Sequence, residues 1–236
     1  ISPAKDERQI QVDEPPALDL HAVAALPMAA GARSTAAVWH RFMRGPVVGN
    51  FLHDQMEWLA GEDFALAAQD DPDGSEPMAA RLLRRCERAG RKDQAADVLQ
   101  WLRAVVHQPL APINVSLAQL GEQDALLAEM EFWLPAQRLS ATRIDALCRQ
   151  HILPGMPRPT LPERELHGML MGFADLVFSH EGRYWVLDYK TNHLGTEAAA
   201  YTPDALARAM LEHRYDVQAA LYLLALHRLL KSRLGD

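Results

Sequence analysis

The chain has 236 residues, of which 49% are hydrophobic and 23% charged, and its formal net charge is −7. That length fits one large domain or one domain with an appendage, and no apolar run approaches the roughly 18 residues that a membrane-spanning helix needs. Two cysteines, Cys86 and Cys148, are too few for a disulfide scaffold or a four-cysteine metal site. A chain that holds nucleic acid by its phosphates is usually basic, so the charge argues against an autonomous DNA-binding domain, but not against carboxylates that bind a cation.

The N-terminal residues 1–35 are rich in alanine, proline and acidic residues, which predicts a linker or a loosely docked arm. The chain begins at Ile1 without a basic-then-apolar leader, so we expect a processed piece or a piece of a longer protein. The presence of only two cysteines indicates a reducing cytoplasm. The structured domain is expected at 36–236, with a mainly helical part at 36–125 and a sheet core at 126–236.

The first long helix is expected to follow a chain break at 45–46, with Asn50 as its cap and its end near Ala60. His53 and Glu57 lie four residues apart on the face beside its apolar stripe. From the sequence alone, His53 is more simply a helix residue with a satisfied ring than a ligand.

A loop is expected at 70–77, followed by a helix over 78–107 that breaks around Gly90. The residues expected to face inward are Leu82, Leu83, Val98, Leu99, Leu102 and Val106. This helix carries the one dense basic patch, for which a solvated helix face is the plainer interpretation: Arg81, Arg84, Arg85, Arg88, Arg91 and Lys92.

A loop or short turn is expected at 116–123, and then a strand over 126–135 that ends at Pro135. Strand alternation places Glu129 and Glu131 on the same face of it. The other predicted elements are helices at 141–151, 203–212 and 215–233, an irregular proline-rich connection at 152–163, and strands at 166–178 and 183–190 joined by a tight turn at Glu181-Gly182.

Three charged residues interrupt the apolar pattern of the two later strands: Asp175 within the first, and Asp188 and Lys190 at the end of the second. Both faces of both strands are otherwise apolar, so we expect the sheet to be covered on both sides. Burying one carboxylate costs several kcal/mol, and two on adjacent strands also repel each other. A divalent cation resolves both difficulties, because carboxylate oxygens are the ligands that Mg²⁺ prefers. The plainer alternative is a buried Asp188–Lys190 salt bridge with Asp175 in a turn contact.

The motif D-x(12)-D-x-K, formed by Asp175, Asp188 and Lys190, resembles that of the PD-(D/E)xK nuclease superfamily. The segments GNFLH, AEMEFWLP, GFADLVFSHEGRYWVLDYKTNHLG and HRYDVQAALYLLALHRLL, in that order, further resemble the C-terminal nuclease domain of RecB-type subunits of bacterial RecBCD, exodeoxyribonuclease V. They span about residues 45 to 233. The resemblance implies an α/β, restriction-endonuclease-like core: a mixed central sheet flanked by helices, with an N-terminal helical region.

The resemblance also implies site residues. Asp175, Asp188 and His53 would bind the metal, with the backbone carbonyl of Tyr189 completing its shell, and Lys190 would be the catalytic lysine. Further motif positions near the site would be Glu129, with Glu131 as the alternative glutamate, and Gln218 and Tyr222. Core packing of an amphipathic helix is the alternative role for Gln218 and Tyr222.

Three positions depart from the family pattern. Ala174 replaces the proline of its "PD", Met171 stands where a basic residue would suit phosphate contact, and the chain stops at LKSRLGD where the family domain continues into another strand. We therefore expect a terminal segment to be missing from this piece.

The implied function is Mg²⁺-dependent hydrolysis of phosphodiester bonds in linear DNA, during recombinational repair of double-strand breaks in the bacterial cytoplasm, with Ca²⁺ or Mn²⁺ able to substitute in the site. The implied partners are DNA, a RecB helicase part of the same polypeptide, and RecC- and RecD-type subunits, with no membrane. The main alternative is a catalytically inactive, nuclease-like docking module. Iron–sulfur RecB-like exonucleases are disfavoured because they need four cysteines.

Overall fold

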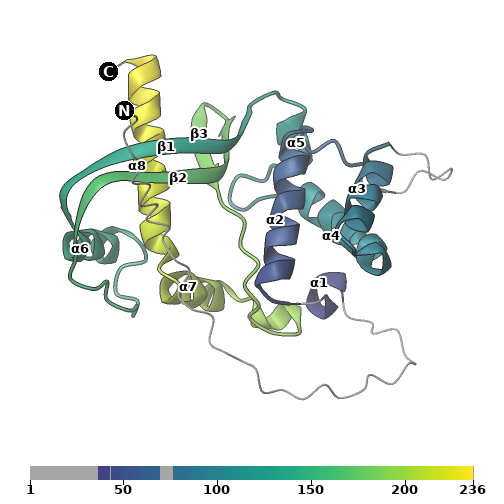
Figure 1. Cartoon of the computed structure of the whole chain (residues 1–236), viewed down its shortest axis with the longest axis horizontal. Helices are drawn as coiled ribbons and strands as arrows, with labels where there is room; N and C mark the ends of the chain where they lie inside the picture. Colours follow the sequence, from purple (N-terminus) through teal and green to yellow (C-terminus); the bar gives the residue numbers. More distant parts are fainter. Residues whose placement is uncertain (1–36, 43, 70–76, 236) are drawn as a thin grey trace, which may run out of the picture.

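A computed structural model describes residues 37–42, 44–69 and 77–235 (Figure 1). The predicted arm at 1–35 lies outside these residues, as does nearly all of the predicted loop at 70–77. The helices and strands, in chain order, are α1 (Val38–Arg41), α2 (Pro46–Ala60), α3 (Pro77–Arg88), η1 (Lys92–Gln94), α4 (Ala95–His107), α5 (Leu117–Gly121), β1 (Leu126–Ser140), α6 (Ala141–His151), β2 (Glu165–His180), β3 (Arg183–Leu187), η2 (Ala198–Ala200), α7 (Pro203–Glu212) and α8 (Tyr215–Leu234).

The start of α2 corrects the sequence prediction. The helix begins at Pro46, after Gly45 at φ 117°, and Asn50 lies inside it rather than capping it. Proline suits the first turn because its φ is already helical and its missing N–H would have no partner there. Helix α2 also carries His53, one of the predicted metal ligands.

The helical part otherwise follows the sequence closely. The break between α3 and α4 is at Gly90, whose φ of 70° favours glycine. Five of the six residues expected to face inward are buried, but Leu83 is 37% exposed. The segment expected as a loop or short turn contains α5, because the Ser116 hydroxyl accepts from the Gln119 N–H (3.3 Å) and the Gln119 side chain accepts from the Ser116 N–H (2.9 Å).

The three strands form an antiparallel sheet in the order β1-β2-β3. The strands of the described residues therefore include no parallel pair of the kind a mixed sheet contains. Strand β1 continues through Pro135 to Ser140, so the expected end at Pro135 is wrong. Within the described residues β1 pairs only with β2, and a proline is tolerated on such an edge strand because an outward N–H would have no partner. The turn at Glu181-Gly182 is confirmed, with both residues at positive φ (50° and 72°), as a tight hairpin requires.

The sheet lies between two groups of helices, as the apolar pattern predicted (Figure 1). Leu176 and Phe178 of β2 pack into the core formed with α2 and the helices around it. Ala174 and Val177 belong to a second core with Tyr222, Ala225 and Leu226 of α8. The sheet is therefore covered on both sides, and α2 and α8 approach the strands from opposite faces.

The strand alternation is disturbed at Glu129 of β1, which lies between the partners of Leu176 and Ala174 and so beside Asp175. The cross-strand pair Ala128–Leu176 packs into the α2 core, but the next pair, Met130–Ala174, packs into the α8 core. Regular strands would place both pairs on one face. Glu129 has φ 50°, in the left-handed region. This local twist therefore lies beside Asp175, the first aspartate of the candidate site.

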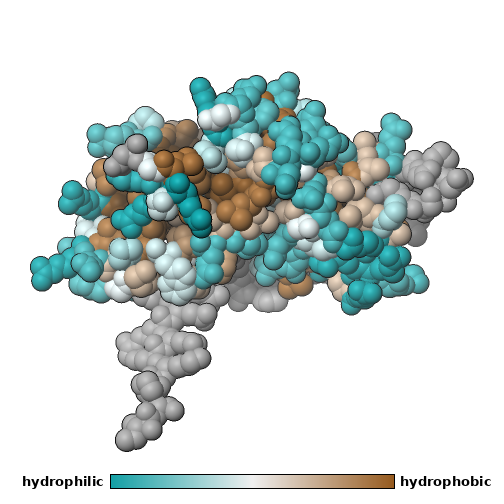
Figure 2. All heavy atoms as spheres, turned by 90° about the horizontal axis from the view of Figure 1, so that it is seen from above, coloured by the Kyte–Doolittle hydropathy of each residue, from teal (hydrophilic) through white to brown (hydrophobic). Residues whose placement is uncertain are grey.

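Apolar side chains remain exposed on the strands and on α8. Figure 2 shows apolar side chains gathered on the face seen from above the view of Figure 1. The large exposed ones on these elements are Leu127, Trp133, Met169, Met171, Phe173, Tyr184, Leu223, Leu224 and Leu234. Over the described ranges, the structure contains no helix with the length and apolar character to span a bilayer.

Candidate active site

Asp175 is held between α2 and the segment after β3. Its carboxylate is only 7% exposed and accepts the Tyr189 N–H at 2.7 Å, and the same oxygen lies 3.1 Å from Nε2 of His53. This hydrogen bond to Asp175 raises the pKa of His53 against the opposing effect of burial. Helix α2 therefore brings His53 to the first aspartate of the motif.

Asp188 directly follows β3, which ends at Leu187 rather than continuing to 190 as expected. One carboxylate oxygen lies 2.5 Å from the Lys190 ammonium, and the other accepts the Gln218 side-chain N–H at 3.2 Å. Burial raises the pKa of Asp188, although the Lys190 hydrogen bond opposes that shift. The Lys190 ammonium also lies 4.4 Å from the centre of the Tyr215 ring, a cation–π contact.

The two candidate glutamates have different surroundings. Burial raises the pKa of Glu129, and the negative charges of Glu57 and Asp175 add to the shift, so Glu129 lies within the charged cluster. Glu131 is exposed and accepts a hydrogen bond from the Trp133 indole at 2.8 Å. The positive φ of Glu129 interrupts the alternation from which a shared face was expected.

Gln218 and Tyr222 lie on α8, one turn apart. The Gln218 side-chain N–H, besides its contact with Asp188, donates to the Tyr222 hydroxyl at 2.6 Å. The Tyr222 ring is buried and meets Phe132 edge-on, with 5.7 Å between ring centres. Burial and the charge of Asp188 raise the pKa of Tyr222 above its usual range. Tyr222 thus packs in the core and also directs its hydroxyl to the site.

The chemistry of the donors suits a hard divalent cation, because Asp175 and Asp188 supply carboxylate oxygens and the His53 imidazole lies 3.1 Å from Asp175. They do not form a closed ligand set. Asp175 turns toward His53 and Tyr189, and Asp188 turns toward Lys190 and Gln218. Over the ranges 37–42, 44–69 and 77–235, no three His, Cys, Asp or Glu side chains converge as metal ligands. Asp175 instead contacts the His53 imidazole, and Asp188 pairs with the Lys190 ammonium.

Sequence reasoning missed a buried ion-pair network at the start of α8. The carboxylate of Asp216, fully buried, lies 2.7 Å from the Arg158 guanidinium, itself buried, and 3.0 Å from that of Arg214. Arg214 also pairs with Asp145 of α6 at 2.7 Å. The only sequence signal was an acidic residue among apolar neighbours on a helix, two positions before Gln218.

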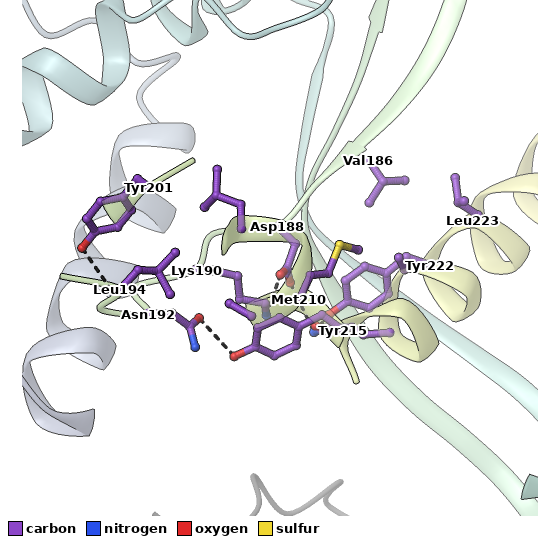
Figure 3. A pocket seen from close by; sticks show the side chains of 14 residues that line it. Val186, Asp188, Lys190, Asn192, Leu194, Tyr201, Met210, Tyr215, Tyr222 and Leu223 are labelled. Atoms are coloured by element: carbon purple, nitrogen blue, oxygen red, sulfur yellow. Dashed lines mark hydrogen bonds and ion pairs between the residues drawn. The ribbon is translucent and has the colours of Figure 1, made fainter. Parts of the chain in front are cut away.

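A cavity of about 520 Å³ opens beside Asp188 and Lys190, between the segment after β3, α7 and α8 (Figure 3). The Tyr201 hydroxyl holds the segment that forms one wall, since it accepts from the Leu194 N–H and donates to the Gly195 carbonyl, each at 3.3 Å. The Tyr215 hydroxyl donates to the Asn192 side-chain oxygen at 3.2 Å. None of these cavity residues except Asp188 and Lys190 belonged to the expected catalytic or metal-binding set.

The fold and the D-x(12)-D-x-K site point to a nuclease of the PD-(D/E)XK class, and the comparison with family models gives the same class. Residues 31–235 match the model of the PD-(D/E)XK nuclease superfamily, so the chain belongs to that superfamily. Within it, the chain is similar to the RecBCD enzyme subunit RecB, which confirms the resemblance seen in the sequence motifs. The restriction-endonuclease-like fold class is confirmed with it.

The chain is 42% identical over 200 residues to RecB of Escherichia coli K12, a match that covers 84% of the chain and 16% of that protein. For RecB of Haemophilus influenzae the identity is 38% over 136 residues, covering 56% of the chain and 11% of that protein. For RecB of Mycobacterium tuberculosis H37Rv the identity is 36% over 164 residues, covering 60% of the chain and 15% of that protein. The chain therefore spans about a sixth or less of these relatives.

Proposed function

We propose that the chain is the nuclease part of a RecBCD-type helicase–nuclease and hydrolyses phosphodiester bonds of DNA with the help of a divalent cation, in the first place Mg²⁺. The observation that carries the proposal is the arrangement of Asp175 and Asp188. Two poorly exposed carboxylates are joined through Tyr189, and each contacts a side chain, His53 or Lys190, that a cation could displace. Such an arrangement has no evident purpose in a purely structural sheet.

In this proposal Asp175, Asp188 and His53 hold the cation, with the carbonyl of Tyr189 as a further ligand. The bound cation would lower the pKa of a water molecule and withdraw charge from the phosphate. Lys190, released from Asp188 when that carboxylate becomes a ligand, would orient the water or stabilise the charge of the transition state. Gln218 would keep hold of Asp188 from α8, and Glu129 would supply a further acceptor near His53.

The partners follow from the RecB relatives, and they are part of the proposal. With a net charge of −7, the chain on its own should have a low electrostatic affinity for DNA. We propose that a helicase part of the same polypeptide, with RecC- and RecD-type subunits, delivers single strands from linear duplexes to the site during recombinational repair.

The proposal is tested by degradation of linear DNA in Mg²⁺ by the chain and by its Asp188→Ala variant. We expect a loss of at least a hundredfold in rate for Asp188→Ala and none for Glu163→Ala, which changes an exposed acid outside the predicted site residues. Retention of full Mg²⁺-dependent activity by Asp188→Ala would falsify the assignment.

The second candidate function is an inactive docking module, and titration with Ca²⁺ separates the two. A nuclease site should give heat of binding that Asp175→Asn abolishes. A docking module should give no such heat and no degradation of DNA under any divalent cation. The paired charges at Asp175 and Asp188 favour the nuclease.

A further inference from the structure

We propose that the cavity beside Asp188 and Lys190 is a nucleobase subsite: it takes the base next to the phosphate that lies at the catalytic carboxylates. This inference rests on the proposed function and adds a substrate contact to it. Its volume of about 520 Å³ falls within the roughly 300–1,000 Å³ usual for small-ligand sites.

The walls of the cavity suit the flat faces of a base. Leu194 comes from the segment after β3, Leu206 and Met210 from α7, and Leu223 from α8. Figure 3 shows Tyr201 and Leu194 on one side of the space and Tyr222 and Leu223 on the other, with Asp188 and Lys190 between them. A slot with apolar sides and a charged edge matches a nucleotide, in which an apolar base is joined to an anionic phosphate.

One polar group is placed to meet the edge of a base. The Tyr215 hydroxyl donates a hydrogen bond to the side-chain oxygen of Asn192 at 3.2 Å. This bond fixes the orientation of the amide and leaves its nitrogen as a donor. Among the described residues no hydrogen-bond partner is found for that nitrogen. Amide donors pair well with the ring-nitrogen and carbonyl acceptors of bases.

The Lys190 position connects the subsite to the chemistry. The ammonium lies between the Asp188 carboxylate at 2.5 Å and the Tyr215 ring at 4.4 Å, at the border of cavity and carboxylates. A phosphate that meets Lys190 would therefore place its adjoining base at the cavity. In an acidic chain such uncharged contacts compensate for weak attraction of phosphates.

The experiment measures binding of a short fluorescent oligothymidylate in Ca²⁺, and of a matched oligonucleotide in which the sugars carry no bases. We expect Leu206→Trp, which fills the cavity from a half-exposed position, to weaken oligothymidylate binding about tenfold and leave the abasic strand unchanged. Asn192→Ala should give a smaller loss, about threefold, with the same selectivity. The control is Leu147→Trp, an equally exposed leucine on α6 outside the cavity, which should change neither.

Equal binding of oligothymidylate by Leu206→Trp, Asn192→Ala and the unsubstituted chain would overturn the subsite, as would equal binding of the two strands by the unsubstituted chain. Calorimetry with Ca²⁺ on the same proteins separates this failure from that of the proposed function. If Ca²⁺ still gives heat of binding but the bases contribute nothing to oligonucleotide binding, the subsite is excluded and the metal site is supported. If binding depends on the bases but Ca²⁺ gives no heat of binding, the subsite is supported and the metal site is excluded.

Discussion

The backbone N–H of Tyr189 donates to the carboxylate of Asp175 at 2.7 Å, which ties the first aspartate of the motif to the residue directly after the second. The bond fixes the position of Asp175 relative to Asp188, although their side chains turn toward α2 and α8 respectively. Burial raises the pKa of the Tyr189 hydroxyl above its usual range, in line with a ring that packs in the α2 core. The main chain therefore sets the spacing of the two aspartates, while their carboxylates contact side chains of different helices.

The first prediction concerns stabilisation by the cation. Ca²⁺ at about a hundredfold above its Kd should stabilise the chain by about 2.7 kcal/mol, and Asp188→Asn should remove that gain. Without the cation, Asp188→Asn should unfold at no lower temperature than the unsubstituted chain, because burial already disfavours the charged carboxylate. Thermal unfolding with and without Ca²⁺ measures both effects. A Ca²⁺-dependent rise that survives the substitution would exclude Asp188 as a ligand.

The second prediction separates the two glutamates. Glu129→Gln removes a charge that repels Glu57 and Asp175, so the cation-free chain should become slightly more stable, while its nuclease activity should fall at least tenfold. Glu131→Gln changes an exposed side chain bonded to Trp133 and should alter stability by less than about 0.5 kcal/mol and leave activity unchanged. Urea unfolding and DNA degradation give the two readouts. Equal loss of activity in both variants would contradict the assignment of Glu129.

The D-x(12)-D-x-K motif can be recognised in the sequence because its parts are local. Asp175 lies on the β2–β3 hairpin and Asp188 and Lys190 directly follow it. Two residues, Glu181 and Gly182, encode its turn, and its apolar pattern predicts the covered sheet. The twist at Glu129 could not be predicted, because strand alternation assumes regular backbone and a positive φ at a glutamate has no sequence signature.

Other features depend on contacts that only the folded chain supplies. Pro135 continues β1 because that strand lies at the edge of the described sheet, which local propensity does not reveal. The pairing of Arg158 with Asp216 joins residues 58 positions apart, so neither residue's neighbours predict it. The prediction of His53 as a ligand comes from the family resemblance rather than from helix periodicity, since a histidine on a helix face has many uses.

The third prediction tests how β2 supports Tyr222. A methyl group on Gly172 would lie 2.5 Å from the Phe132 ring, which itself meets the Tyr222 ring edge-on. Gly172→Ala should therefore destabilise the chain by about 1–3 kcal/mol and reduce activity through displacement of Tyr222. Gly61→Ala is the matched control, because its nearest neighbour would be at 3.5 Å and its φ of −68° suits alanine. Unfolding in urea measures the difference. If Gly172→Ala loses no more stability than Gly61→Ala, the Phe132 ring moves aside without cost and the prediction is wrong.

The last prediction concerns the buried network at the start of α8, which positions Gln218 two residues further on. Burial alone would raise the pKa of Asp216, but hydrogen bonds from Arg214 and Arg158 outweigh it and hold the pKa below its usual value. Asp216→Asn leaves Arg158 without its counterion inside the protein and should lower the free energy of unfolding by about 3 kcal/mol. Asp204→Asn is the control, because Asp204 is exposed and also lies in the first turn of its helix. It should lose less than about 1 kcal/mol.

The pH dependence follows from the direction of the shift in Asp216. A carboxyl whose pKa is lower in the folded than in the unfolded chain stabilises the fold at pH values above its unfolded pKa, and this contribution is lost as the pH falls through the folded pKa. The difference in unfolding free energy between the unsubstituted chain and Asp216→Asn should therefore stay constant from about pH 5 to pH 8 and shrink below about pH 4. Urea unfolding across that range gives the curve. A difference that instead grew toward acid pH would mean that Arg158 does not stabilise the charged form of Asp216.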